Sequence, residues 1–182
     1  TTGEMHGWYN FTAKYPENLN MVKSFGNKAG DYGISAATVA NGRTYAYIFQ
    51  HYGTNTTGWN DYQMPIGIAE LDYATGEYVI KFKTETFHGF QYNVLFYDMA
   101  YDPVTNKIYA CEFAYDIQGN EAIDTGMMNI YTIDPETCEP TFIGRADNIF
   151  TAMAADNGVV YGFTHDYDEE YQQQVASILK FD

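Results

Sequence analysis

Three stretches of this chain resemble one another, and this internal repeat limits the possible folds more than any other feature. Each stretch leads from small and apolar residues into a turn signal, and a tyrosine followed by a small residue comes within a few positions of the turn. A repeat spacing of about 50 to 60 residues points to arrays, solenoids or propellers. The copies are 35–49, 96–113 and 150–163, with turns at Asn41-Gly42, at Asp102-Pro103 with Thr105-Asn106, and at Asn157-Gly158.

A second hairpin, built from two strands and a short turn, follows each of the first two copies. Its turn begins at Asp72 or Asp134, whose carboxylate can accept hydrogen bonds from backbone N–H groups two or three residues further on. We expect Gly76 and Pro135 to supply the special backbone angles of these turns. The two hairpins lie at 66–82 and 128–144, a third begins at 175–182, and a weaker copy with a longer, proline-containing turn lies at 6–26.

The repeat unit is therefore four short strands, here named A to D in chain order. No segment combines an apolar period of 3.6 residues with capping signals at both ends, so no helix is expected. Aromatic residues make up 18% of the chain, which favours sheets. Four-stranded antiparallel units repeated around an axis are the blades of a β-propeller. A β-sandwich is the structural alternative, but it does not explain similar strand pairs at a fixed period.

We therefore expect an all-β chain in which 1–182 forms a single, partial β-propeller of about three and a half blades. Propellers close with about four to eight blades, and an unclosed arc leaves sheet edges exposed. A cleaved fragment or a second chain is expected to complete a ring of about six to eight blades; a homodimer of two arcs is the less favoured variant. The expected parts are a C–D hairpin at 1–30, blades at 34–83 and 96–144, and a blade at 148–182 that lacks its last strand.

The charge of the chain excludes several classes of partner. There are 24 acidic side chains against 9 lysines and arginines, which gives a formal net charge of -15. Such a surface repels phosphate backbones and anionic lipids, so we expect neither nucleic-acid nor membrane-surface binding. No apolar run approaches the roughly 20 residues of a membrane-spanning helix. The first ten residues carry no basic or apolar targeting signal, so no targeting peptide is expected within this sequence.

Two cysteines are too few for a disulfide framework. Cys111 falls in the middle of an expected strand and Cys138 in an expected turn. The sequence therefore favours a buried free thiol at Cys111 and a semi-exposed one at Cys138 over a bridge between them.

The second repeat carries a family resemblance. The segment "AYDPVTNKIYACEF" followed by "MNIYTIDPETCEPTFIG" resembles blades of the YVTN and Kelch-like group of β-propellers, which occur in bacterial secreted and cell-surface proteins. The likeness covers most of the chain from Ile34 onward, although the double glycine of Kelch repeats proper is absent. It implies the propeller architecture and an extracellular or cell-surface location. It implies little about function, because such propellers include binders, scaffolds and enzymes.

The expected ligand site lies on one face of the propeller, where the B–C and D–A loops converge. These loops are long and combine aromatic rings with amide and carboxylate groups, a mixture that suits sugars or a protein surface. Functional residues also tend to lie on loops held by a rigid scaffold. For each ring, packing inside its own loop is the alternative interpretation. The candidate residues are His51, Tyr52, Trp59, Asn60, Tyr62, His88, Phe90, Tyr92, Tyr115, Asp116, His165, Asp166 and Tyr167.

Evidence for metals and catalysis in the sequence is weak. Asp166, Asp168 and Glu170 alternate along one loop and could supply part of a calcium site, but a solvated acidic loop is favoured. The four histidines lack zinc-site spacing, and no GxSxG elbow is present. A pair of carboxylates for glycoside hydrolysis stays open, because their separation depends on the fold.

Three functional hypotheses follow. The favoured one is a non-enzymatic extracellular or cell-surface binding module that holds a glycan or protein. The second is a glycoside hydrolase or lyase propeller whose catalytic acids lie partly in the missing half. The third is a structural scaffold in a surface assembly. No cofactor is expected beyond the calcium ion considered above.

Overall fold

The computed structural model describes residues 7–12, 15–24, 31–53, 62–83, 96–118, 121–168 and 173–181. In these residues the regular structure is β-strand without helix, which confirms the all-β prediction. None of this described part forms a helix of the length and apolarity that a membrane span requires. The strands are β1 (Gly7–Thr12), β2 (Tyr15–Ser24), β3 (Tyr32–Ala40), β4 (Arg43–Gly53), β5 (Tyr62–Leu71), β6 (Tyr78–Lys83), β7 (Asp98–Asp102), β8 (Lys107–Gln118), β9 (Glu121–Ile133), β10 (Pro140–Ala146), β11 (Ala152–Asp156), β12 (Val159–Asp168) and β13 (Gln173–Phe181).

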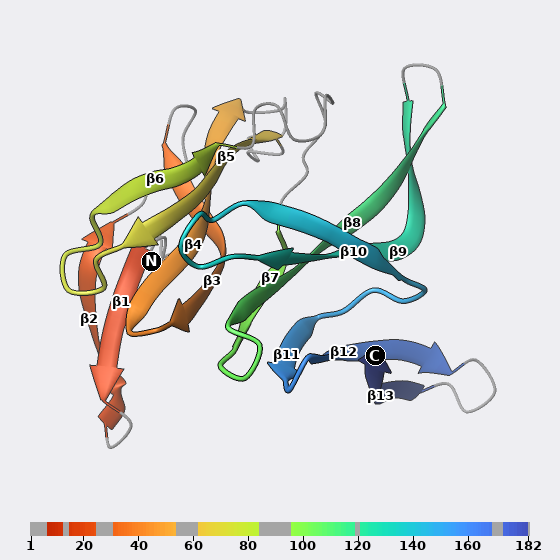
Figure 1. The fold of residues 1–182 in the computed structure, drawn as a ribbon. Helices are drawn as coiled ribbons and strands as arrows, with labels where there is room; N and C mark the ends of the chain where they lie inside the picture. Colours follow the sequence, from red (N-terminus) through yellow and green to blue (C-terminus); the bar gives the residue numbers. More distant parts are fainter. Residues whose placement is uncertain are drawn as a thin grey trace.

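The strands form four antiparallel sheets in chain order (Figure 1). Strands β1 and β2 make a two-stranded hairpin. The first sheet contains β3 to β6, the second contains β7 to β10, and the third contains β11 to β13. Within each sheet, neighbours in sequence are neighbours in space. Two of the expected four-strand units are therefore present as four-stranded antiparallel sheets, and the third has three described strands.

Alternating side chains let the first sheet pack on both of its faces. In β4, Tyr45 and Tyr47 belong to an apolar cluster shared with the second sheet. Ala46 and Ile48, which point the other way, belong to a cluster that Trp8 of the β1–β2 hairpin contacts. Successive side chains of a strand alternate between faces, so a strand between two sheets must be apolar at every position. This explains why β4 reads as an almost continuous run of tyrosine, alanine and isoleucine.

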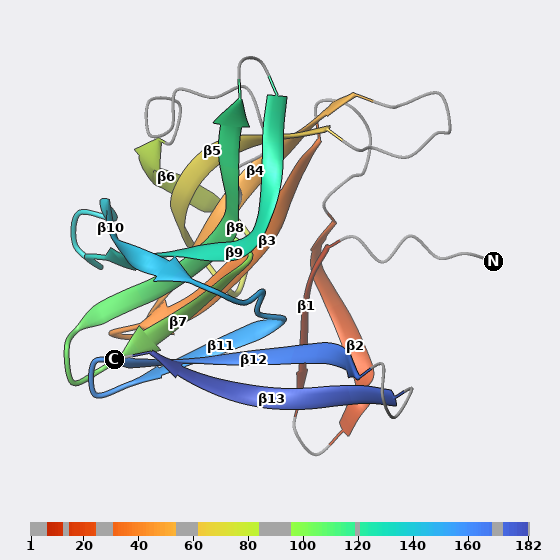
Figure 2. The same ribbon diagram turned by 90° about the vertical axis from the view of Figure 1, so that its right-hand side faces the viewer.

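Three apolar layers therefore separate the four sheets. One lies between the hairpin and the first sheet, the next between the first and second sheets, and the last between the second and third sheets. Figure 1 shows this order, with the hairpin at the left, the first and second sheets to its right and the third sheet below the second, each turned relative to its predecessor. The strands β3, β7 and β11, which begin the three larger sheets, lie next to one another (Figure 2).

The turns after these three strands gather on one side of the molecule. Asn41, Asn106 and Asn157 all adopt positive φ angles, of 52°, 52° and 55°. Asparagine tolerates this left-handed conformation better than most residues. Asn41 Nδ2 donates a hydrogen bond to Asn106 Oδ1 at 2.8 Å, which connects the turns of the first and second sheets.

Asp102 connects the turns of the second and third sheets. Its buried carboxylate accepts hydrogen bonds from the Gly158 N–H at 2.6 Å, the Val104 N–H at 2.9 Å and the Thr105 hydroxyl at 2.8 Å. Burial acts to raise the pKa of Asp102, but these donors outweigh it and hold the pKa below its ordinary value. The carboxylate is thus an ionised link between two sheets.

The turns between the third and fourth strands repeat the same geometry. The Asp72 carboxylate accepts from the Ala74 N–H, and the Asp134 carboxylate accepts from the Glu136 N–H, as the sequence predicts. Gly76 has the expected positive φ of 70°. In the second of these turns the positive φ belongs to Cys138, at 58°, and not to Pro135. Cys138 occupies the place of Gly76, and its N–H donates to the Asp134 carbonyl as the Gly76 N–H does to Asp72.

Both cysteines are free and buried. The expectation of a semi-exposed thiol at Cys138 is therefore wrong. This side chain belongs to the apolar layer between the first and second sheets, because the β9–β10 turn folds over Tyr45. Tyr45 Oη donates a hydrogen bond to the Pro135 carbonyl in the same turn at 2.8 Å.

Candidate functional site

The candidate residues named from the sequence fall into three groups. Tyr115 and Asp116 are described with their side chains, and both are exposed. The backbone alone is described for His51 and Tyr52 in β4, Tyr62 in β5, and His165, Asp166, Tyr167 and Asp168 in β12. Trp59, Asn60, His88, Phe90, Tyr92 and Glu170 lie outside the described residues.

The described candidates lie in strands, so the prediction that they belong to loops is wrong. His51 pairs with Gln63, and Gly53 pairs with Tyr62, so the β4–β5 hairpin extends further than the turn signals suggest. Asp116 pairs with Ile123 in the same way. Polar and aromatic residues end the apolar pattern in these segments, but the backbone ladder continues through them.

The far ends of the three long hairpins diverge. In Figure 1 the far ends of β4 and β5 and those of β8 and β9 lie at separate places at the top of the view, and the far ends of β12 and β13 lie at the right, although the opposite turns lie together. In the described strands, Tyr115 and Asp116 are therefore not brought beside the segments that carry His51 or His165. The site is built instead around the second sheet alone.

One face of the second sheet carries a connected group of polar side chains. We name Glu112, Asp116, Asn129, Tyr131 and Arg145 the polar cluster. Glu112 and Asp116 lie on β8, Asn129 and Tyr131 on β9, and Arg145 on β10. Cross-strand pairing of Asn129 with both Glu112 and Arg145 places the three strands' side chains side by side.

The inner half of the polar cluster is buried. Glu112 is 2% exposed, and its Oε1 accepts hydrogen bonds from the Tyr131 hydroxyl at 2.5 Å and from Asn129 Nδ2 at 3.1 Å. Burial raises the pKa of Glu112 to about 7, although these two donors act to lower it. Burial and the adjacent Glu112 carboxyl also raise the pKa of Tyr131. Glu112 therefore changes its protonation state close to neutral pH.

The outer half of the polar cluster is open to solvent. Arg145 Nε donates to Asn129 Oδ1 at 3.0 Å, and Arg145 Nη1 lies 3.4 Å from Asp116 Oδ1. Both charged side chains are exposed, so their ion pair contributes little to stability. Asn129 thus connects the buried Glu112 to the exposed Arg145 and Asp116.

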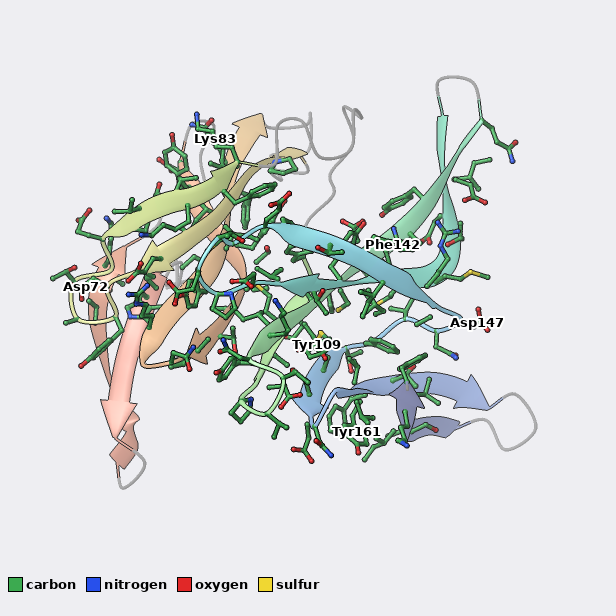
Figure 3. All side chains as sticks on the ribbon, viewed as in Figure 1. Asp72, Lys83, Tyr109, Phe142, Asp147 and Tyr161 are labelled. Carbon is green, nitrogen blue, oxygen red and sulfur yellow. The ribbon has the colours of Figure 1, made fainter. Side chains whose placement is uncertain are left out.

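An exposed aromatic ring stands on the same face. Phe142 of β10 pairs with Tyr131 in the ladder, and the two rings meet edge to face with centroids 5.6 Å apart. The Phe142 side chain is 54% exposed. Figure 3 labels Phe142 on β10 and Asp147 beyond the end of that strand. The Phe142 ring packs against Tyr131 on one side and is exposed to solvent on the other. It therefore provides a flat apolar surface beside Asn129 and Arg145.

A metal centre is not evident in the part of the chain that the structure describes, where no group of three or more His, Cys, Asp or Glu side chains is placed to hold an ion. The calcium candidates Asp166, Asp168 and Glu170 are not among the described side chains. Their role therefore stays a prediction.

Comparison with known proteins adds no relative. No protein-family model matches this chain, and no curated protein matches it.

Sequence reasoning identified Asp116 but missed Glu112, Asn129, Tyr131 and Phe142. A signal for Glu112 is present, because it interrupts the apolar series Ile108, Ala110 and Ala114 on one face of β8. A charged residue at such a position is seldom buried unless it is paired. Phe142 gives no comparable signal, since its exposure depends on β10 being the outer strand of its sheet.

Proposed function

We propose that this chain is part of a β-propeller and serves as a non-enzymatic binding module for glycans, outside the cell or at its surface. In this proposal the three larger sheets are successive blades, and a further fragment or chain completes the ring. The order of the sheets, the adjacency of β3, β7 and β11, and the linked turns at one side support the arrangement. The resemblance to bacterial surface propellers supports the location.

The exposed Phe142 ring beside the open half of the polar cluster carries the proposal. Sugar rings present flat C–H faces, which stack on aromatic rings, and hydroxyls, which pair with charged and amide groups. Phe142 supplies the ring, and Asp116, Asn129 and Arg145 supply hydrogen-bonding groups on the same sheet face. The ring is fixed by Tyr131 before a ligand arrives, so little side-chain entropy is lost on binding.

Glycoside hydrolysis is the second candidate, and one observation favours it. Glu112 has a pKa of about 7, as a general acid requires. One observation weighs against it. Glu112 is 2% exposed and lies behind Asn129, so a substrate in solvent does not reach its carboxyl group. We therefore assign Glu112 to holding Asn129 and Tyr131.

Binding to an oligosaccharide array, followed by calorimetry with the best ligand, tests the proposal. Phe142→Ala and Asp116→Ala should each weaken binding at least about tenfold, which corresponds to about 1.4 kcal/mol. Tyr73→Ala is the matched control, because Tyr73 is an exposed aromatic residue in the β5–β6 turn, away from this face. Failure of every glycan to bind, or equal effects of Phe142→Ala and Tyr73→Ala, would refute the proposal. Release of reducing sugar from the bound ligand would favour the hydrolase.

A further inference from the structure

The third sheet exposes a cross-strand pair that the other two sheets bury. The ladders place Tyr47 opposite Ile68 in the first sheet and Phe163 opposite Ile178 in the third. The corresponding pair of the second sheet is Cys111 with Ile130. In each case the first member follows the repeated tyrosine by two positions, so the three pairs occupy one structural place.

Exposure differs sharply among these equivalent positions. Ile68 is 0% exposed and Ile130 is 5% exposed, because the next sheet covers each of them. Ile178 is 64% exposed and Phe163 is 40% exposed. Phe163 and Ile178 lie on the face of the third sheet that points away from the second sheet, while Val160 and Leu179 fill the layer between the two.

A second equivalence involves the turns. Asp102 ends β7, and its carboxylate accepts the Gly158 N–H of the next sheet's turn. Asp156 ends β11 at the matching position, paired with the first residue of the following strand as Asp102 is. Asp156 is exposed. The second sheet contacts the third through an apolar pair and a carboxylate at the end of its first strand. The third sheet exposes the equivalents of both, which are the Phe163–Ile178 pair and Asp156.

We propose that the outer face of β11–β13 is a docking surface for a further four-stranded antiparallel sheet of this same repeat. On its contacting face, the docking sheet carries the residue types that the second sheet packs against the first sheet. These are an aromatic ring in place of Phe96, a methionine in place of Met99 and a β-branched residue in place of Ile108. A backbone N–H of its first turn binds Asp156. The inference rests on the propeller arrangement proposed above, and it is independent of the glycan site.

A second copy of this chain fits the face less well. The face is three strands wide and ten residues long at most, which gives about 500 Å², well below the roughly 800 Å² that each partner buries in a stable protein complex. Two copies that each carry a net charge of -15 also repel one another. We therefore expect the isolated chain to be monomeric by light scattering. A dimer that Ile178→Lys dissociates would show that a second copy occupies the face and would overturn the proposal.

The direct test adds one more repeat to the full chain. In the extended chain a second copy of residues 73–146 is fused directly after Asp182, so that Asp182 stands where Asp72 stands in the first sheet. The added segment supplies a turn of the Asp72 type after β13, a fourth strand for the third sheet, and then a copy of the second sheet. Peptide-resolved hydrogen exchange then follows β12 and β13 in the parent and the extended chain. Docking predicts exchange at least about tenfold slower in the extended chain, because a covered sheet opens less often.

Substitutions on the face separate docking from a merely attached extension. Ile178→Lys should leave hydrogen exchange in the parent chain unchanged, since the Ile178 side chain is in solvent there. In the extended chain the same substitution should abolish the slower exchange of β12 and β13. Val39→Lys is the matched control, because Val39 is an exposed β-branched residue on β3. An extension that folds without slowing exchange in β12 and β13, or one that stays unfolded, would overturn the proposal. Glycan binding through Phe142 is measured separately, so the two proposals can fail independently.

Discussion

At the scale of single residues, the buried carboxyls of the second sheet differ in a way that their surroundings explain. Asp102 receives two backbone N–H groups and a hydroxyl, and these donors keep its pKa low despite burial. Glu112 receives a phenol hydroxyl and an amide on a single oxygen, and burial raises its pKa to about 7. Backbone amides in a turn thus hold a carboxylate charged, whereas a position between two sheets favours the neutral acid.

This difference makes the stability of the protein depend on the protonation of Glu112. The folded chain holds the proton between pH 4.5, the ordinary value, and pH 7, whereas the unfolded chain releases it. The free energy of unfolding should therefore fall by about 3 kcal/mol as the pH rises through this range, and Glu112 should add no further change above it. Glu112→Gln should remove this decline and be more stable than the parent at pH 8, as urea unfolding at several pH values will show.

Glu139→Gln is the control for this experiment, because Glu139 is exposed in the β9–β10 turn. It should leave the pH dependence as it is in the parent. A Glu112→Gln variant whose stability falls with pH as steeply as that of the parent would contradict the assignment.

At the scale of strands and turns, glycine appears where an aromatic ring crosses the sheet. A Cβ added at Gly162 of β12 would lie 2.4 Å from the ring of Phe150, which is fully buried between the second and third sheets. A Cβ added at Gly144 of β10 would meet nothing within 4 Å. Both glycines lie within strands, but the fold leaves room for a side chain at Gly144 and not at Gly162.

Gly162→Ala should therefore destabilise the chain by about 1 to 3 kcal/mol, because the buried ring has no room to move. Gly144→Ala should change the stability by less than about 1 kcal/mol, and loss of chain entropy in the unfolded state favours a gain. Urea unfolding of both variants measures the difference. Equal effects would mean that the Phe150 ring does not pack against Gly162 as described.

The repeat made much of the element scale predictable. The turns at Asn41, Asp72 and Asn157 follow from residues whose local chemistry sets the backbone. Cys138 was unpredictable, since its left-handed conformation is stabilised by burial against Tyr45 of another sheet and not by an intrinsic preference. The ends of the hairpins were misplaced because ladder pairing continues through polar residues that read as loop.

The candidate site was predictable only in part, for a related reason. Asp116 was predicted as a site residue because it is a polar residue near the end of an expected hairpin. Its partners Asn129 and Arg145 lie on two other strands, and only the ladder register brings the three together. Phe142 became a candidate because it is on an outer strand, which depends on the order of strands in the sheet.

At the scale of the whole molecule, the acidic surface works against the stacking of the sheets. The formal charge of -15 is spread over sheets that only apolar layers and a few turn contacts hold together. Repulsion among like charges destabilises a compact state, and salt screens charges that are exposed.

Raising the sodium chloride concentration from about 10 mM to about 0.15 M should therefore stabilise the protein, as the screening length falls from about 30 Å to about 8 Å. We expect the melting temperature to rise by about 2–4 °C, which corresponds to about 1 kcal/mol for a chain of this size. Calorimetry measures the change. Choline chloride is the control, because it should give the same rise if screening is the cause, and an unchanged melting temperature in both salts would contradict the expectation.

The two buried thiols provide a way to watch the layers separate. Cys111 lies in the layer between the second and third sheets, and Cys138 lies in the layer between the first and second. Burial raises the pKa of Cys111 to about 12 and also raises that of Cys138, so neither reacts with an alkylating reagent while its layer is closed. The ratio of the two alkylation rates would therefore report whether the chain comes apart one junction at a time or in a single concerted event.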